Sequence, residues 1–109
     1  MIWKDIKSID TIQDIYASND TYILFKHSTR CPVSSMAKRN LEHDKNLIPE
    51  ETVIYYLDLI AHRDISNAIA ELWKVKHESP QLLIVKGDTC LYNASHSDIE
   101  MQDIIPFIS

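Results

Sequence analysis

Apolar residues recur at helical spacing in the first part of the chain and then give way to a strand-like run. The helical group follows Ser8, a candidate N-cap, and comprises Ile9, Ile12, Ile15 and Tyr16. The next apolar run, Tyr22 to Phe25, has no polar alternation, which is typical of a strand covered on both faces. We therefore predict one helix followed by a central, parallel strand.

Two more helices and a second buried strand are predicted in the middle of the chain. A helix begins at Pro32, where a missing N–H costs nothing, and ends before Pro49, with apolar positions Val33, Met36, Ala37, Leu41, Leu47 and Ile48. Residues 52–57 are β-branched and aromatic and predict a strand. The next helix is marked by Ile65, Ala68, Ile69 and Leu72.

The last third of the chain predicts a hairpin and a final helix. Residues 82–85 and 90–92 are strand-like and flank the chain's one glycine, Gly87, in a tight connection. Ser97 to Glu100 reads as a capping box that opens a helix with Pro106 inside it. With residues 3–6 as a short edge strand, this order predicts an α/β, thioredoxin-like fold: a mixed four- to five-stranded sheet flanked by helices on both faces.

Size and charge narrow the function classes. We expect one domain over residues 1–109, because this length is enough to close a hydrophobic core. The net charge of -5 argues against a nucleic-acid partner. We expect no membrane association, because no apolar run approaches the ~20 residues of a spanning helix, and no secretion signal is recognisable. The two cysteines lie far apart, so we expect free thiols in the reducing cytoplasm.

Cys31 is the leading candidate for chemistry. It lies between a predicted buried strand and a predicted helix, where free backbone N–H groups and the helix dipole stabilise a thiolate, the form that attacks disulfides. Thr29 and Arg30 precede it in an exposed turn, and Arg30 would add positive potential if directed at the sulfur. The alternative is that Cys31 is a small buried core residue, because free cysteine is often buried. Its place at the corner favours the reactive interpretation.

Ser34 stands where a Cys-x-x-Cys oxidoreductase carries its second, resolving cysteine. A hydroxyl can hydrogen-bond to the neighbouring sulfur but cannot displace a partner from a mixed disulfide, so a second thiol from solution would have to finish the reaction. Ordinary first-turn helix chemistry is an equal alternative for Ser34. Pro80 directly precedes a predicted strand. In a thioredoxin-like fold this proline would be cis and face Cys31, leaving the backbone of Ser79 free to pair with an extended substrate.

The segments 29–34, 78–81 and 92–96, together with Trp3 and Lys4, closely resemble the YtxJ, or monothiol bacilliredoxin, family over nearly the whole chain. The resemblance implies a monothiol thiol-disulfide oxidoreductase that removes bacillithiol from protein mixed disulfides. Cys31 would attack, keep the bacillithiol, and be regenerated by free bacillithiol or a reductase. Bacillithiolated proteins and bacillithiol are then the expected partners, with bacillithiol as a co-substrate and no bound cofactor.

Other interpretations stay open. The chain could be a non-catalytic thioredoxin-fold adapter that binds peptides beside Ser79 and Pro80. A weaker alternative is an iron-sulfur site like that of monothiol glutaredoxins, which Pro32 and the absence of a glycine-rich site sequence argue against. The spacing of the histidines and cysteines matches no zinc site, so we expect no metal. Four further residues are more readily explained as core or solvated side chains than as site residues: Cys90, His77, His96 and Asp58.

Overall fold

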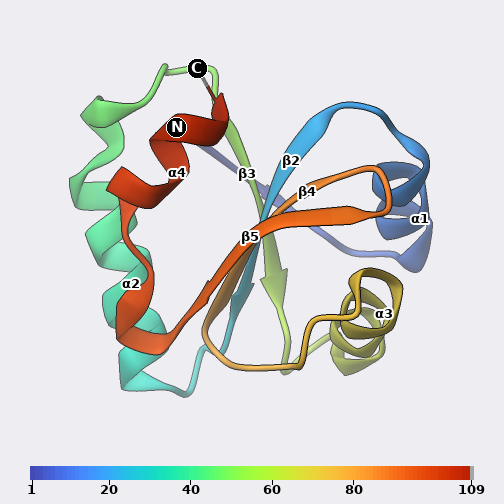
Figure 1. The fold of residues 1–109 in the computed structure, drawn as a ribbon. Coiled ribbons are helices and arrows are strands. Elements are labelled where there is room, and N and C mark those ends of the chain that lie inside the picture. The colour runs from blue at the N-terminus through green and yellow to red at the C-terminus, as the bar shows by residue number, and fades with distance from the viewer. Residues whose placement is uncertain (109) are drawn as a thin grey trace.

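The computed structural model describes residues 1–108, which form a five-stranded mixed sheet with helices on both faces (Figure 1). The strands are β1 (Ile2–Asp5), β2 (Thr21–His27), β3 (Val53–Asp58), β4 (Gln81–Lys86) and β5 (Thr89–Ser95). The helices are α1 (Ile9–Ala17), α2 (Pro32–His43), α3 (Arg63–Trp73) and α4 (Met101–Ile108), with 3-10 turns at Lys45–Leu47 and His96–Asp98. The strand order is β1-β3-β2-β4-β5, in agreement with the expected thioredoxin-like fold.

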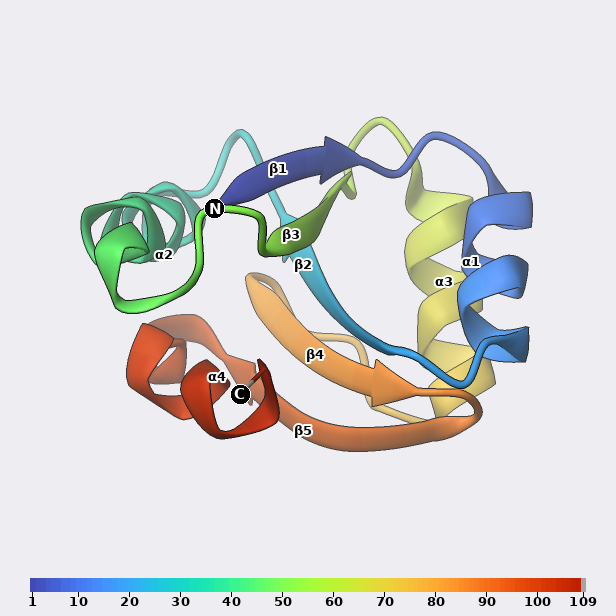
Figure 2. The same ribbon diagram turned by 90° about the horizontal axis from the view of Figure 1, so that it is seen from above.

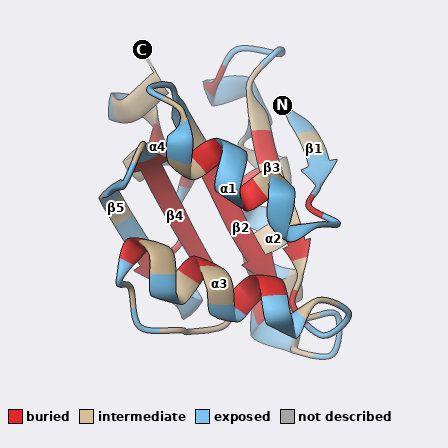
Figure 3. Ribbon diagram, turned by 90° about the vertical axis from the view of Figure 1, so that its right-hand side faces the viewer, coloured by how far each residue is buried: buried red, intermediate tan, exposed pale blue. Residues whose placement is uncertain are grey.

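The helices are divided into two pairs by the sheet. Viewed from above, α2 and α4 cover one face and α1 and α3 cover the other (Figure 2). The predicted central strand is β2, which pairs in parallel with β3 on one side and antiparallel with β4 on the other. The prediction of a parallel strand therefore holds for one of its two edges. Because both faces of β2 and β4 are covered, these strands are the buried centre of the molecule (Figure 3).

Side chains of β2 alternate between two hydrophobic cores. Ile23 and Phe25 pack under α2 and α4, whereas Leu24 packs under α1 and α3. Each core is closed by apolar residues of its helices, Leu41 and Ile104 on one face and Ile12 on the other, all of them fully buried. At about 25 cal/mol for each Å² of apolar surface removed from water, these two cores provide the main favourable contribution to folding.

The start of α1 and the edge strand agree with the predictions. The Ser8 hydroxyl accepts a hydrogen bond from the Thr11 N–H at 3.4 Å and caps α1. The N-terminal segment forms an edge strand at Ile2–Asp5, one residue earlier than predicted, and pairs in parallel with β3.

The second helix is shorter than predicted. It ends at His43, and its core-facing residues are Ser34, Ala37 and Leu41. Val33 and Met36, predicted as part of the apolar face, are exposed. The prediction followed hydrophobicity alone, whereas the helix turns a serine inward and two large apolar side chains outward beside Cys31.

The predicted capping box at Ser97 was wrong. Residues His96–Asp98 form a 3-10 turn, and α4 begins only at Met101. Ile99 is extended and buried in the core beneath α2 and α4, so the chain reaches the core before it turns into the helix. Pro106 lies inside α4, which continues to Ile108.

The hairpin between β4 and β5 needs its glycine. Gly87 has a φ of +58°, which side-chain-bearing residues rarely adopt, and a Cβ there would lie 3.3 Å from the Ser18 carbonyl oxygen. The Gly87 carbonyl also accepts a hydrogen bond of 2.9 Å from the indole N–H of Trp73, which ties the hairpin to α3. Within residues 1–108, none of the helices has the length and apolar character needed to cross a membrane.

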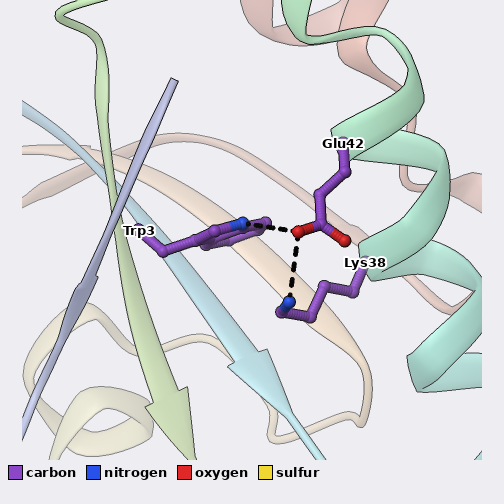
Figure 4. Close-up of polar contacts among 3 residues, drawn as sticks. All are labelled: Trp3, Lys38 and Glu42. Atoms are coloured by element: carbon purple, nitrogen blue, oxygen red, sulfur yellow. Dashed lines mark hydrogen bonds and ion pairs between the residues drawn. The ribbon is translucent and has the colours of Figure 1, made fainter.

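The edge strand β1 is fastened to α2 by three side chains (Figure 4). The indole N–H of Trp3 donates to Glu42 Oε2 at 3.2 Å, and Lys38 Nζ pairs with the same oxygen at 3.3 Å. The Lys38 ammonium also lies 5.1 Å from the centroid of the Trp3 ring, within the range of a cation-π contact. These contacts hold the C-terminal half of α2 against the edge of the sheet.

Candidate active site

Cys31 occupies the N-cap position of α2, at the corner predicted from the sequence. Its backbone is extended, Pro32 follows at the first helical position, and the Cys31 carbonyl accepts the first helical hydrogen bond from Ser35 N–H at 3.1 Å. Pro32 has no N–H, and the N–H groups of Val33 and Ser34 lie in the first turn, where the helix supplies no carbonyl for them. The half-buried sulfur thus belongs to the residue that borders the positive end of the helix dipole.

Ser34 is fully buried, and its hydroxyl is used to hold the turn that precedes Cys31. Ser34 Oγ accepts a hydrogen bond of 3.0 Å from Ser28 N–H and lies 2.7 Å from His27 Nδ1. A further bond, from Cys31 N–H to the Ser28 carbonyl at 3.2 Å, closes the same turn. The hydrogen bonds of the hydroxyl are therefore directed to the turn and to His27, which favours a structural role for Ser34.

His27 is the site residue that the sequence analysis missed. It is the last residue of β2 and is buried, with its ring centroid 5.9 Å from that of Phe25 and 5.4 Å from that of Tyr56. The hydrophobic pattern places it in the turn after a strand that ends at Phe25. A usable signal was its spacing, because His27 falls two residues after Phe25 and so continues the same face of the strand.

The environment of His27 favours its neutral form. Burial lowers the pKa of His27 below its ordinary value of 6.5, and the nearby Lys38 charge lowers it further, while Asp58 and a hydrogen bond with the Ser34 backbone oppose the change. In the neutral tautomer that carries its proton on Nε2, the His27 Nδ1 accepts a hydrogen bond, and the Ser34 hydroxyl can donate it while its oxygen accepts from Ser28 N–H. His27 therefore fixes Ser34, and Ser34 fixes the turn that carries Cys31.

This arrangement predicts a loss of stability in acid. Because the pKa of His27 is lower in the folded chain than in the unfolded chain, the unfolded chain binds the proton more readily. The stabilisation is complete above pH 6.5 and is lost as the pH falls through the folded-state pKa. A tenfold difference in proton affinity between the two states corresponds to about 1.4 kcal/mol. Urea unfolding measured at several pH values should show that the free energy of unfolding decreases as the pH is lowered from 7 to 5.

His27→Phe keeps the aromatic packing and removes the proton-binding group, so the fall should be shallower in this variant. His43→Phe is the matched control, because His43 is exposed on α2. An equal pH dependence in the wild type and in His27→Phe would contradict the prediction.

Ser79 and Pro80 lie at the same end of the sheet as Cys31. The Ser79–Pro80 peptide bond is cis, as predicted. The antiparallel register that pairs Lys26 with Gln81 places Pro80 opposite His27, and Figure 1 shows the start of α2 and the segment entering β4 at one end of the sheet. The Pro80 carbonyl accepts a hydrogen bond of 2.9 Å from His96 N–H, so β5 steadies this segment.

A small pocket lies between α2 and the segment that follows β5, and Cys31 is not part of its lining. It is lined by Val33, Met36, Ala37, Asn40, His96, Ser97 and Ile99. His96 has a φ of +56°, and its Nε2 lies 3.4 Å from Glu78 Oε2. Thr29 and Arg30 are exposed on the turn before Cys31. The fold therefore gathers all the predicted site residues at one end of the sheet: Cys31, Thr29, Arg30, Pro32, Ser34, Ser79 and Pro80.

Cys90 lies at the other end of the sheet. It pairs with Val85, which lies opposite Tyr22 near the start of β2, whereas Cys31 follows the end of β2. At about 3.3 Å per strand residue, the five residues from Tyr22 to His27 span roughly 16 Å, and a disulfide needs Cα atoms within about 7 Å. Burial raises the pKa of the Cys90 thiol. Cys90 is therefore partly buried against the core under α1 and α3 and is too distant to resolve a disulfide at Cys31.

Asp58 holds a turn. Its Oδ1 accepts hydrogen bonds from the N–H groups of Ile60 and Ala61 at 3.1 and 3.3 Å. Among residues 1–108, no three His, Cys, Asp or Glu side chains converge in a group that could hold a metal ion.

Comparison with known proteins identifies relatives of the chain. The sequence model of a family described as monothiol bacilliredoxin BrxC matches residues 4–104. A solved thioredoxin-fold structure described as a candidate oxidoreductase is 30% identical, with a TM-score of 0.83, and the match covers 99% of this chain and 95% of that one. At this level of identity the match supports a related redox function as well as the fold.

Thioredoxins are structurally similar at lower identity. Thioredoxin from Malassezia sympodialis is 15% identical with a TM-score of 0.74, over 100% of this chain and 92% of that one. Oxidised thioredoxin from Plasmodium falciparum is 14% identical with a TM-score of 0.70, over the full length of both chains. These thioredoxins show the fold alone, whereas the family model and the 30% identical oxidoreductase structure support a thiol redox function.

Proposed function

Because the chain belongs to the monothiol bacilliredoxin family, we propose that it removes bacillithiol from protein mixed disulfides through Cys31. The observation that carries this proposal is the pairing of one cysteine at the N-cap of α2 with a buried serine three residues later. The first position places the cysteine at the end of the helix where backbone N–H groups are free, and the second supplies no thiol to release what the first one captures.

The proposed reaction is two successive thiol-disulfide exchanges. The Cys31 thiolate attacks the bacillithiol sulfur of the mixed disulfide, a Cys31–bacillithiol disulfide forms, and the cysteine of the substrate protein leaves as a thiolate that takes up a proton from water. The thiolate of a second bacillithiol then attacks the captured bacillithiol sulfur. Cys31 leaves as a thiolate and bacillithiol disulfide is the product. A partner reductase could perform the second exchange in place of free bacillithiol.

The remaining site residues have supporting roles in this proposal. Thr29, Arg30 and Pro32 shape the turn around the sulfur, and Ser34 holds that turn to His27. Ser79 and Pro80 receive the extended backbone of the substrate protein beside Cys31. The bacillithiolated proteins and bacillithiol itself are the partners. Two free, distant thiols suit the reducing cytoplasm, which we propose as the compartment.

The test is the intact mass of the wild-type chain after incubation with a test protein that carries one bacillithiol in mixed disulfide. We expect the chain to gain the mass of one bacillithiol, and peptide mapping to locate it at Cys31, while the test protein loses the same mass. Addition of free bacillithiol should return the chain to its original mass. No transfer, or transfer to Cys90, would overturn the proposal.

A further inference from the structure

The central strand β2 ends in two consecutive buried polar residues, Lys26 and His27. Neighbouring residues of a strand point to opposite faces, so His27 lies on the face of α2 and Lys26 on the face of α1 and α3. The role of His27 at the Cys31 turn is described above. Lys26 contributes to neither core and has no part in the exchange chemistry.

The contacts of Lys26 lead to the segment that enters β4. Its Nζ donates to the Ser66 carbonyl oxygen of α3 at 3.1 Å and lies 3.3 Å from His77 Nδ1. The same His77 nitrogen lies 3.2 Å from the Ser66 hydroxyl. His77 belongs to the connection between α3 and β4, three residues before Pro80. The end of β2 is thus linked by a side chain to the loop that carries Ser79 and Pro80.

A second buried side chain holds the same loop. Gln81 is opposite Lys26 in the antiparallel register, so the two side chains are neighbours on one face of the sheet. Gln81 Nε2 donates to the Lys76 carbonyl oxygen at 3.0 Å. Two adjacent, fully buried polar residues therefore hold two consecutive residues of the loop, Lys76 and His77.

The burial of Lys26 is expected to lower the free energy of unfolding. Its side chain is fully buried on the same face of β2 as Leu24, and the two partners of its ammonium group are a backbone carbonyl and an imidazole, which do not neutralise its charge. Burial lowers the pKa of Lys26 to about 8. Burial, and then the Lys26 and Arg63 charges, lower the pKa of His77, which favours the neutral imidazole. A methionine at position 26 would fill a similar space without burying a charge.

We propose that the end of β2 positions both halves of the site, with His27 fixing the turn that carries Cys31 and Lys26 fixing, through His77, the loop that carries Ser79 and the buried Pro80. Lys26 is then a positioning residue for substrate recognition and takes no part in the reaction at sulfur. The kinetic effect expected below rests on the proposed function, because only that function makes the Pro80 loop the docking site of the substrate protein.

The kinetic test compares Lys26→Met with the wild type, using a test protein that carries one bacillithiol in mixed disulfide. We expect KM for this protein to rise about tenfold, equivalent to ~1.4 kcal/mol of recognition, with kcat changed less than about twofold. The rate at which iodoacetamide alkylates Cys31 should be unchanged, because the Cys31 turn is fixed by His27. His77→Phe should also raise KM, and the double variant should be no worse than either single one, because each substitution already removes the Lys26–His77 contact that links β2 to the loop.

Amide hydrogen exchange provides a test that does not depend on catalysis. Lys26→Met should increase exchange in residues 75–81 and leave residues 28–35 unchanged, whereas His27→Phe should do the reverse. A lysine with only a structural role would alter both segments together. Equal changes in both segments, additive effects in the double variant, or a fall in kcat at constant KM would each overturn the inference. If the wild type transfers no bacillithiol, the proposed function fails. The amide hydrogen exchange of the variants then still tests whether Lys26 and His27 position different segments.

Discussion

Cys31→Ser should reduce the rate of bacillithiol removal to the uncatalysed background, whereas Cys90→Ser should retain the wild-type rate within about twofold. A serine hydroxyl cannot form a disulfide, so the first exchange has no nucleophile once the Cys31 sulfur is replaced. Cys90 lies at the hairpin end of β5, on the face of α1 and α3, and cannot replace it. Release of the bacillithiol from a mixed-disulfide test protein, followed by mass spectrometry, measures both variants.

The same pair of variants separates the enzyme from the adapter alternative. A non-catalytic adapter would bind extended peptides beside Pro80 equally well with Cys31 or Ser at position 31. Loss of bacillithiol removal in Cys31→Ser with retained fold, checked by circular dichroism, supports the enzyme. Activity retained in Cys31→Ser, or lost in Cys90→Ser, would show that the reactive sulfur has been assigned to the wrong residue.

Ser34→Cys should change the product of the reaction from a stable adduct to an internal disulfide. Ser34 is fully buried in the first turn of α2, three residues after Cys31. A thiol introduced at position 34 would attack the Cys31 sulfur of the mixed disulfide and expel bacillithiol as a free thiol. The captured mass should then disappear, leaving a chain about 2 Da lighter than its reduced form. Intact mass before and after reduction distinguishes the two products.

Two control variants test whether a thiol at position 34 is what releases the bacillithiol. Ser34→Ala removes the hydroxyl without adding a thiol, so it should still hold the bacillithiol adduct at Cys31. Ser35→Cys adds a thiol one position further along α2, outside the Cys-x-x-Cys spacing, and should also leave the Cys31 adduct in place. Persistence of the Cys31 adduct in Ser34→Cys would mean that position 34 cannot reach the captured sulfur.

Local sequence signals predicted most of the fold. Ser8 was identified as the cap of α1, the Gly87 turn as the hairpin, and Cys31-Pro32 as the start of α2. Each of these follows from the conformational preference of one residue and its immediate neighbours. The same information allowed the cis bond at Pro80 to be expected once the fold was assumed.

Sequence reasoning failed where tertiary packing overrides hydrophobicity. Val33 and Met36 are apolar but exposed, because α2 turns Ser34 toward His27. Lys26 and His27 are polar but buried, because the strand extends past Phe25 and both faces of its end are covered. A hydrophobic pattern assigns the first pair to the core and the second to a loop. The side chains that hold the site are therefore the ones that this pattern assigns wrongly.

The two tryptophans provide separate optical signals for the two sides of the molecule. Trp3 lies against Phe25 and under the Lys38 ammonium on the side of α2, whereas Trp73 lies in the opposite core and donates to the hairpin at Gly87. With the other tryptophan replaced by phenylalanine, the fluorescence of Trp3 should respond to displacement of α2, and that of Trp73 should respond to changes on the far face. The chain therefore carries built-in reporters that distinguish a movement confined to the reactive side from a general loosening of the structure.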